Sequence, residues 1–453
     1  MSILKLTIEA ELDLLQRKSF SYFVHETNFT NGLVKDKTMP DWPASITATG
    51  FALAAYPVGV KRGFMSRTDA VERTLATLRF FWNSPQGPES DATGYQGFYY
   101  HFLDMQTGRR AWHCELSTID SAFLFAGMLT AGRYFDADTV DENEIRTLAD
   151  GLYRRANWQW AQNQGETLTH GWKPENGFIH YRWEDYDEAL LLYMLALGSP
   201  TYPVSDSSYT AWGSTYKWER HYGYDYLYAG SFFTHQLSHI WIDFRGIQDA
   251  FMREKDMDYF ENSRRATYVQ QEYAIDNPLQ FKGYGRCCWG ITASDGPGPD
   301  TIKVDGIERQ FFNYLARGVP YGPDDGTIAP WAVVASLPFA PDIVLPTMDY
   351  FIHHVELKSI NPYGFKASFN ATHPDRTHNP FGWVSPWQYG LHQGPIILMV
   401  ENYRSGMLWQ LIRTCPYIVS GLRRAGFTGG WLCGLTPAQL DTTGYDLPNA
   451  SLY

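Results

Sequence analysis

A pattern that occurs three times along the chain limits the folds that it can adopt. A stretch of glycine and aromatic residues runs into a segment that opens with acidic or hydroxyl residues and continues as an apolar helix. The copies join residues 97–104 to 114–131, residues 177–184 to 185–197 and, more weakly, residues 363–370 to 387–400. The pattern predicts carboxylates at the starts of several buried helices, beside loops that are rich in aromatic side chains.

Helical periodicity dominates the rest of the chain, because apolar residues recur three and four positions apart. Strand-like alternation is confined to short aromatic pieces. Short turns alternate with long Gly/aromatic loops, so we expect an all-α fold in which stacked helical hairpins close into a ring, with the long loops on one rim. The expected helices are 7–24, 44–56, 67–82, 118–135, 141–162, 187–197, 232–243, 259–274, 330–337, 342–354 and 395–413.

The length of 453 residues exceeds the usual size of a single hydrophobic core. The sequence nevertheless contains no Ser/Gly/Pro linker, no block of like charge and no low-complexity tract. Closed architectures such as barrels remain one domain at this length. We therefore expect one domain over residues 1–453.

Charge and hydropathy exclude several classes of partner. The net charge is −12 and the basic residues are scattered, which argues against nucleic acid. The chain has no apolar run long enough to span a membrane, and residues 1–11 lack the apolar core of a signal peptide. The expected location is the cytoplasm, or the periplasm if an export signal has been removed.

The aromatic content of 16% suits stacking on sugar rings, although large cores also use aromatic residues.

The acidic residues at the predicted helix starts have the composition of a glycosidase site. Glycoside hydrolysis needs two carboxyl groups, about 5–5.5 Å apart for retention and about 6.5–9.5 Å apart for inversion. Glu115 and Asp120 lie at one loop-to-helix junction and Glu188 begins another helix, so a ring of helices brings them together. The alternative is that Asp120 and Glu188 only occupy first-turn positions that the helix dipole favours.

Other polar residues are candidates for substrate contacts. Asp243 and Arg245 either clamp sugar hydroxyls or form a buried ion pair. His113, His235, His239 and His392 lack metal-ligand spacing, so we expect core or hydroxyl-contacting histidines and neither metal nor cofactor. The five cysteines are expected to be free buried thiols. Further predicted sugar contacts are Trp331, Tyr363, Trp387, Gln393 and Glu401.

Several longer stretches carry a resemblance to a known family. They are residues 114–120, 187–200, 235–246, 259–267, 292–297 and 401–406. On these residues the chain resembles the bacterial glycoamylase-like domain family, which includes glycoside hydrolase family 144, the β-1,2-glucan-degrading enzymes.

The resemblance implies an (α/α)6 toroid and a metal-independent, inverting glycosidase that cleaves β-1,2-glucan or its oligosaccharides, by endo or exo action. The acids of the family map onto Glu115, Asp120 and Glu188, with Glu188 as the general acid and Asp120 or Glu115 activating water. Two alternatives stay open. One is a sugar phosphorylase or transglycosylase on the same toroid, with Arg245 and Arg404 near the phosphate. The other is a non-catalytic glycan-binding protein.

Overall fold

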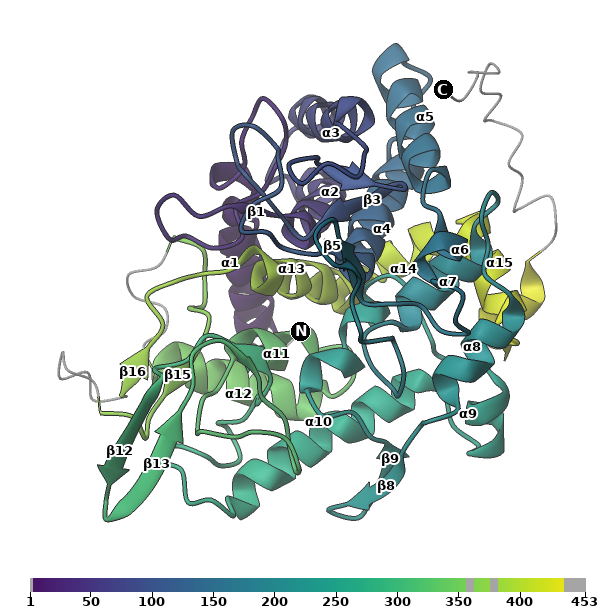
Figure 1. Ribbon diagram of the computed structural model, residues 1–453. Helices are drawn as coiled ribbons and strands as arrows, with labels where there is room; N and C mark the ends of the chain where they lie inside the picture. Colours follow the sequence, from purple (N-terminus) through teal and green to yellow (C-terminus); the bar gives the residue numbers. More distant parts are fainter. Residues whose placement is uncertain (1–2, 356–361, 375–381, 436–453) are drawn as a thin grey trace.

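Figure 1 shows the computed structural model, which describes residues 3–355, 362–374 and 382–435. Most of its regular structure is helical. The α-helices are α1 (Ile3–His25), α2 (Ile46–Arg62), α3 (Arg67–Asn83), α4 (Thr118–Tyr134), α5 (Val140–Arg154), α6 (Trp158–Ala161), α7 (Leu190–Gly198), α8 (Asp206–Gly213), α9 (Ala250–Glu254), α10 (Tyr259–Asp276), α11 (Pro330–Ala335), α12 (Pro341–His353), α13 (Gly390–Ser405), α14 (Met407–Ile412) and α15 (Pro416–Arg424). Three 3-10 helices are η1 (Phe232–His235), η2 (Leu237–Ile240) and η3 (Gly430–Gly434).

The strands are short and lie mostly in the loops that precede or connect the helices. They are β1 (Ala44–Ser45), β2 (Gly94–Tyr95), β3 (Phe98–Tyr100), β4 (Phe102–Leu103), β5 (Leu116–Ser117), β6 (Gly171–Lys173), β7 (Gly177–Phe178), β8 (Trp218–His221), β9 (Tyr224–Leu227), β10 (Ile247–Gln248), β11 (Ala293–Ser294), β12 (Asp300–Val304), β13 (Ile307–Phe311), β14 (Leu315–Ala316), β15 (Phe369–Asn370), β16 (Trp383–Val384) and β17 (Thr428–Gly429).

The largest sheet joins two of the Gly/aromatic loops. Its five strands are antiparallel neighbours in the order β2-β3-β5-β6-β7. Tyr99 pairs with Ser117, and Leu116 pairs with Trp172. The loop before α4 and the loop before α7 therefore share one sheet. The hairpins β8–β9 and β12–β13 lie at the lower edge of the molecule in Figure 1.

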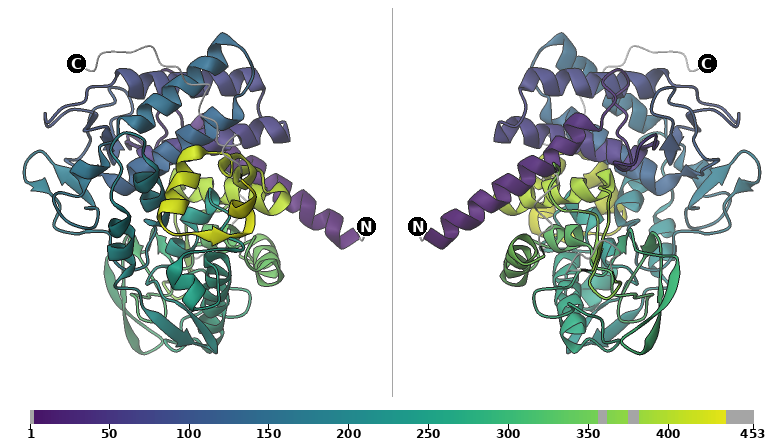
Figure 2. Two further views of the ribbon diagram at one scale, coloured as in Figure 1. Left: turned by 90° about the vertical axis from the view of Figure 1, so that its right-hand side faces the viewer. Right: turned by 90° about the vertical axis from the view of Figure 1, so that its left-hand side faces the viewer.

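The core depends on helices that approach each other closely. A Cβ atom on Gly127 of α4 would collide with the carbonyl oxygen of Gly50 in α2, and one on Gly50 would meet the backbone of Phe123. In the same way, a Cβ atom on Gly198 of α7 would collide with the carbonyl oxygen of Tyr417 in α15, and one on Gly421 of α15 would collide with that of Met194 in α7. Only residues without a Cβ allow this spacing. Figure 2 shows that α1, by contrast, projects from the body of the molecule.

Short strands and serine caps fix the residues at which helices α2 and α4 begin. Ser45 of β1 and Ser117 of β5 are the N-caps of α2 and α4, and their hydroxyls accept hydrogen bonds from the backbone N–H groups of Ala48 and Asp120. A serine in extended conformation is a favoured N-cap because its oxygen satisfies an otherwise unpaired helix N–H. The sheets therefore place the first turns of α2 and α4 with defined geometry.

The predicted helices are largely confirmed, and the mostly helical class with them. Residues 67–82 and 118–135 match α3 and α4 within one residue. Three segments differ. The stretch 232–243 forms the short helices η1 and η2, 141–162 divides into α5 and α6, and 395–413 divides into α13 and α14. Helices α8, α9 and α15 and most strands were not expected, because each is too short to establish a periodic pattern.

Two side-chain predictions need partial correction. Cys114, Cys288 and Cys415 are buried thiols as expected, but Cys433 is exposed and Cys287 is partly exposed. His235, His239 and His392 are buried, whereas the side chain of His113 is 85% exposed. Over the described ranges, no helix combines the length and the apolar character needed to cross a lipid bilayer.

The contact between α2 and α4 predicts a large effect of one methyl group. Gly127→Ala forces the two backbones apart, so we expect a loss of unfolding free energy of about 1–3 kcal/mol or more, as for other overpacked cores. Urea denaturation measures it. Gly213→Ala in α8 is the matched control, because its Cβ would find neighbours only at 3.6 Å and beyond. Equal stability of both variants would contradict the close contact.

Candidate active site

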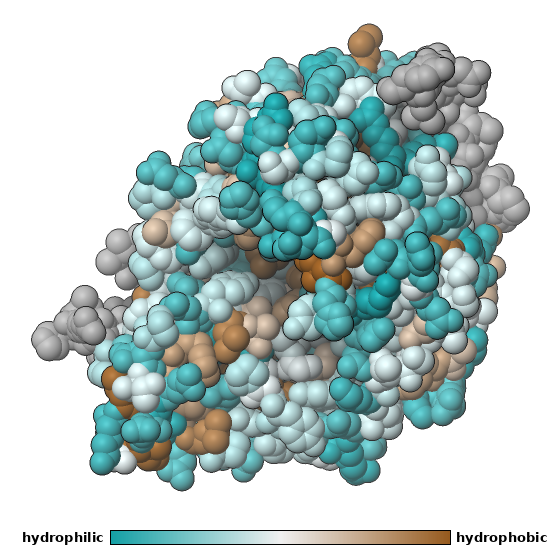
Figure 3. Space-filling view, viewed as in Figure 1, coloured by the Kyte–Doolittle hydropathy of each residue, from teal (hydrophilic) through white to brown (hydrophobic). Residues whose placement is uncertain are grey.

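A cavity of ≈650 Å³ lies where the starts of several helices meet. Figure 3 shows that this face of the molecule is hollowed near its centre. Part of its lining comes from helix starts. These residues stand in the first turns of α2, α4, α11 and α13, directly before Ala189, which is the N-cap of α7, and in η1 and η2. They are Thr47, Asp120, Trp331, Leu391, Glu188, Phe233 and Leu237.

Asp120 lies in the first turn of α4, and two hydroxyl groups donate hydrogen bonds to its carboxyl oxygens. Thr47 Oγ1 donates to Oδ1 at 2.5 Å, and Ser117 Oγ donates to Oδ2 at 2.5 Å. His101 Nε2 lies 3.5 Å from Oδ1. Both carboxyl oxygens of Asp120 therefore accept a hydrogen bond, and its side chain remains 14% exposed.

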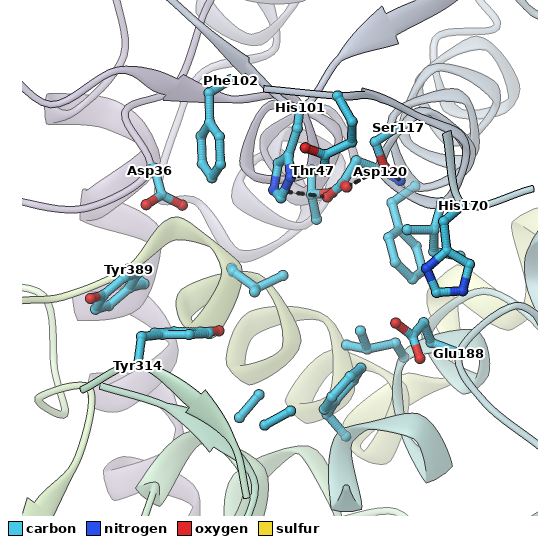
Figure 4. Close-up of a pocket in the computed structure, with 18 of the residues that line it drawn as sticks. Asp36, Thr47, His101, Phe102, Ser117, Asp120, His170, Glu188, Tyr314 and Tyr389 are labelled. Atoms are coloured by element: carbon cyan, nitrogen blue, oxygen red, sulfur yellow. Dashed lines mark hydrogen bonds and ion pairs between the residues drawn. The ribbon is translucent and has the colours of Figure 1, made fainter. Parts of the chain in front are cut away.

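His101 lies between two carboxyl groups. Its Nδ1 atom is 2.8 Å from Glu115 Oε1, and its other nitrogen faces Asp120. Burial alone would lower the pKa of His101, but the charges of Asp120 and Glu115 outweigh it and raise this pKa to about 9. The pKa of Glu115 is lowered, because the bond to His101 outweighs the effect of burial. The group is best described as an imidazolium between two carboxylates (Figure 4).

Glu188 lies across the cavity from this group (Figure 4). Burial raises its pKa from 4.5 to about 7, with a smaller contribution from the charge of Asp120. The neighbouring Asp187 has a separate structural role. Its Oδ1 accepts hydrogen bonds from the backbone N–H of Ala189 at 2.9 Å and from Trp212 Nε1 at 3.3 Å. Asp187 thus orders the start of α7, and Glu188 points into the cavity.

A fourth carboxyl group, Asp36, also lines the cavity. Trp42 Nε1 donates to its Oδ2 at 3.0 Å. Burial raises the pKa of Asp36 to about 6, although the Trp42 hydrogen bond opposes the shift. Asp36 lies beside Tyr389 and Tyr314, and His101 and Asp120 lie between it and Glu188 (Figure 4).

Aromatic side chains form much of the remaining wall. The ring of Trp183 stacks on His170 with centroids 3.8 Å apart, and Trp331 stacks on His392 with centroids 5.0 Å apart. Such rings offer flat faces to the C–H surfaces of sugars, while the carboxyl and hydroxyl groups offer hydrogen bonds. Small-molecule sites commonly combine a mainly apolar wall with a few polar groups.

Four of the predicted site residues meet in this cavity: Glu115, Asp120, Glu188 and Trp331. The other predicted substrate contacts lie elsewhere. Asp243 pairs with Arg245 Nε at 2.7 Å and also with Arg413, so the cluster forms the ion pair that was one of its two interpretations, although the Arg245 side chain is half-exposed. The cluster lines a separate cavity with Arg404. The two arginines considered for phosphate binding are therefore outside the cavity that holds the acids.

The remaining predicted contacts are also not among the lining residues of this cavity. Glu401 is buried, and Arg62 Nε donates to it at 2.6 Å. Tyr363 donates to Glu26 Oε1 at 2.8 Å, and Gln393 is buried beside the backbone of Phe365. Trp387 is half-buried, and its backbone N–H donates to Ser385 Oγ at 3.2 Å. Sequence alone misplaced these residues because a polar or aromatic residue near a helix start can pack on either side of that helix.

The residues that sequence reasoning missed are of two kinds. His101 and Ser117 stand inside the stretches that carried the pattern, so a histidine next to the Gly/aromatic turn was an available signal. Asp36, Trp42 and Tyr314 stand in stretches without any motif. Only the folding of distant loops brings them to the cavity.

A cation could be held at two places among the described residues. The first place is formed by Glu11, Asp349 and His353, and the second by His101, Glu115 and Asp120. Within each group, the possible ligand atoms lie within 4.8 Å of one another. In the second group, the hydrogen bond between His101 Nδ1 and Glu115 already joins a positive and a negative partner. The protonated imidazole supplies the charge that a metal ion would otherwise supply between these carboxylates.

The arrangement can move protons across a bound molecule. On one wall stands a buried carboxyl group that keeps its proton near neutral pH, and on the other stands a hydrogen-bonded carboxylate. A buried acid and an ionised partner are the two groups that acid–base cleavage of an acetal requires. Glu188 and Asp120 differ in environment, because burial raises the pKa of Glu188 whereas hydroxyl groups donate to both carboxyl oxygens of Asp120.

Comparison with known proteins shows the family to which the chain belongs and several proteins with a similar fold. Residues 180–416 match the Glycoamylase family, which is described as a putative glucoamylase family. A protein of the same description from Bacteroides uniformis superimposes with a TM-score of 0.81 at 32% identity, covering 93% of this chain and 98% of that one. The endo-β-1,2-glucanase from Chitinophaga pinensis, solved with sophorotriose and glucose, gives a TM-score of 0.81 at 25% identity, with 94% and 99% covered.

A curated relative is the exo-β-1,2-glucooligosaccharide sophorohydrolase (non-reducing end) of Parabacteroides distasonis. It is 28% identical to this chain over an alignment of 450 residues, and the alignment covers 92% of this chain. The chain spans 58% of the length of that relative. The endo-β-1,2-glucanase of Talaromyces funiculosus, with a TM-score of 0.64 at 11% identity, shares the fold.

The charge state of His101 is open to direct measurement. We expect NMR titration of labelled histidine to give a pKa of about 9 in the wild type and a value closer to the ordinary 6.5 in Glu115→Gln. The raised pKa means that the imidazolium stabilises the folded state fully below about pH 6.5, and that this contribution is lost as the pH rises through 9. The exposed Glu184→Gln is the control. A wild-type pKa near 6.5 would refute the imidazolium.

Proposed function

We propose that this chain, which belongs to the Glycoamylase family, is a glycoside hydrolase acting on β-1,2-linked glucan or its oligosaccharides. The observation that carries the proposal is the convergence of Glu188 and Asp120 on one aromatic-lined cavity. Among the similar proteins named above, the Chitinophaga pinensis enzyme is an endo-β-1,2-glucanase and the Parabacteroides distasonis enzyme is an exo-acting β-1,2-glucooligosaccharide sophorohydrolase. The proposal therefore covers both modes.

In the proposed mechanism, the two acids act from opposite sides of the bond. Glu188 donates its proton to the glycosidic oxygen as the bond to the anomeric carbon breaks. A water molecule attacks that carbon, and its proton passes to Asp120, directly or through a substrate hydroxyl. Glu188 is left ionised and Asp120 protonated, and exchange with solvent restores both. Attack by water from the opposite face inverts the anomeric configuration.

Glu115 has a positioning role in this proposal. Its Oε1 atom bonds Nδ1 of His101, so it is less free than Asp120 to accept a proton from water. The imidazolium keeps a positive charge next to Asp120, which favours its ionised form. Because this charge comes from the protein, we propose that hydrolysis needs neither metal nor cofactor, and that it persists in a chelator.

We further propose that the fold is a single catalytic (α/α)6 toroid. Support comes from the cavity, whose wall combines the starts of α2, α4, α7, α11 and α13 with the η1–η2 pair, as six inner elements of a ring would. A single cluster of buried apolar residues runs from Leu12 to Leu432, which supports one domain. Helical relatives of low identity share the fold.

Glu188→Gln tests the function. With linear β-1,2-glucan, we expect wild type to release oligosaccharides and the variant to lose about 10²–10⁴-fold in kcat, the usual contribution of a general acid. Glu184→Gln is the matched control, because its exposed carboxyl group lies on the same loop. Product sizes distinguish endo from exo action, and NMR should show the α-anomer first.

The assay also separates the alternatives. Turnover that requires added phosphate would indicate phosphorolysis. Binding without products, in wild type and Glu188→Gln alike, would indicate a glycan-binding protein. Absence of products from β-1,2-glucan, beside hydrolysis of a β-1,3-, β-1,4- or α-glucan, would refute the proposed linkage.

The pH dependence follows from the raised pKa of Glu188. The general acid must be protonated, so kcat/KM should fall as the pH rises through about 7. The residual activity of Glu188→Gln should lack this descending limb, since the amide does not titrate. A pH–rate profile of both proteins measures it. A wild-type rate that is flat from pH 6 to 9 would contradict Glu188 as the acid.

A further inference from the structure

A second cavity of ≈830 Å³ adjoins the first, and two tryptophans belong to both. Trp42 and Trp112 line each cavity, and their rings meet edge to face with centroids 4.5 Å apart. They come from different loops, before β1 and before β5. The pair therefore stands at the boundary between the cavity that holds the acids and a neighbouring space outside it.

The tryptophan pair is held in place before any ligand arrives. Lys37 Nζ lies 3.9 Å above the ring of Trp42, whose Nε1 is bonded to Asp36. Trp112 packs against Phe102 with centroids 5.2 Å apart. A rigid aromatic surface binds with little loss of side-chain freedom.

Trp112 is nevertheless 54% exposed, and it adopts a left-handed backbone conformation with φ of 54°. Bulky residues seldom adopt this conformation. A large apolar side chain that is both fixed and exposed at a cavity boundary is unusual for a purely structural residue, because burial is what normally stabilises it.

The lining of the second cavity suits a neutral, hydroxyl-rich ligand. Its cationic groups are already paired, since Lys35 Nζ lies 3.2 Å from Glu26 and Arg110 binds Glu175 at 2.6 Å. An anion would therefore find little free positive charge. Carboxylate and amide groups that can bind hydroxyls also line it, namely Asn28, Asp41, Asp104 and Gln106.

We propose that the second cavity binds further glucose units of the same substrate chain, with Trp112 as the stacking surface between the two cavities. This inference rests on the proposed function and extends it to chain length. Sugars beyond the reaction site would then add binding energy, so longer oligosaccharides would be the better substrates. The ring of Trp112 offers one face to a sugar, while Trp42 supports its edge.

A length series tests the proposal. We expect wild-type kcat/KM to rise from the β-1,2-linked trisaccharide upward, and Trp112→Ala to lose about tenfold on the long substrates with little change on the trisaccharide, as expected for an exposed aromatic contact. Gln106→Ala should show a smaller loss with the same length dependence. Tyr403→Ala, an exposed aromatic residue at another cavity, is the matched control. Circular dichroism verifies folding.

The outcomes separate this proposal from the proposed function. Hydrolysis with an equal effect of Trp112→Ala at every length, or with no effect, overturns the second cavity as a subsite and leaves the function intact. Absence of hydrolysis of every β-1,2-linked substrate refutes the function. In that case calorimetric titration with the same series decides the subsite, and equal affinities of wild type and Trp112→Ala for the long oligosaccharide overturn it.

Discussion

The close contact between α2 and α4 determines the geometry on which the site depends. At Gly50 and Gly127 the two backbones approach as near as helices without Cβ atoms allow. One turn from Gly50, Thr47 is then near enough to donate to Asp120 at 2.5 Å. A slightly wider spacing would leave that carboxylate without one of its two hydroxyl donors. The stability of the core and the charge state of the site are thus linked through the same pair of helices.

The cavity keeps several carboxyl groups in different states by giving each a different environment. His101 supplies the positive charge, and it reaches Glu115 and Asp120 but not the wall that bears Glu188. Glu188 is half-buried, and its desolvation raises the pKa to about 7. Asp36 is half-buried as well, although its indole donor offsets part of the same effect. Burial and hydrogen bonding act in opposite directions at neighbouring acids.

The sequence permitted a correct prediction of the mostly helical class and of most long helices, and the three acids that it singled out line one cavity while their roles stay a prediction. These features come from local signals, namely periodicity and acidic residues at helix starts. The partners of Asp120 show the limit. Ser117 is three residues away, but Thr47 and His101 come from other elements and meet Asp120 only through packing. Asp243 and Glu401, which were predicted as sugar contacts, are not among the residues that line this cavity, because their sequence context does not say where their side chains point.

The five-stranded sheet and the loop that bears Trp112 shape different parts of the two neighbouring cavities. Strands β3 and β5 anchor Ser117 and the start of α4, whereas Trp112 lies in the loop between β4 and β5, which closes on itself through a bond from the Asp104 N–H to the Arg109 carbonyl. Insertions or deletions in that loop would reshape the second cavity and the boundary that Trp112 forms, whereas the strand pairing that holds Ser117 lies outside the loop. Relatives could thereby diverge in preferred polymer size while retaining one reaction centre, and the loop is a natural target for engineering.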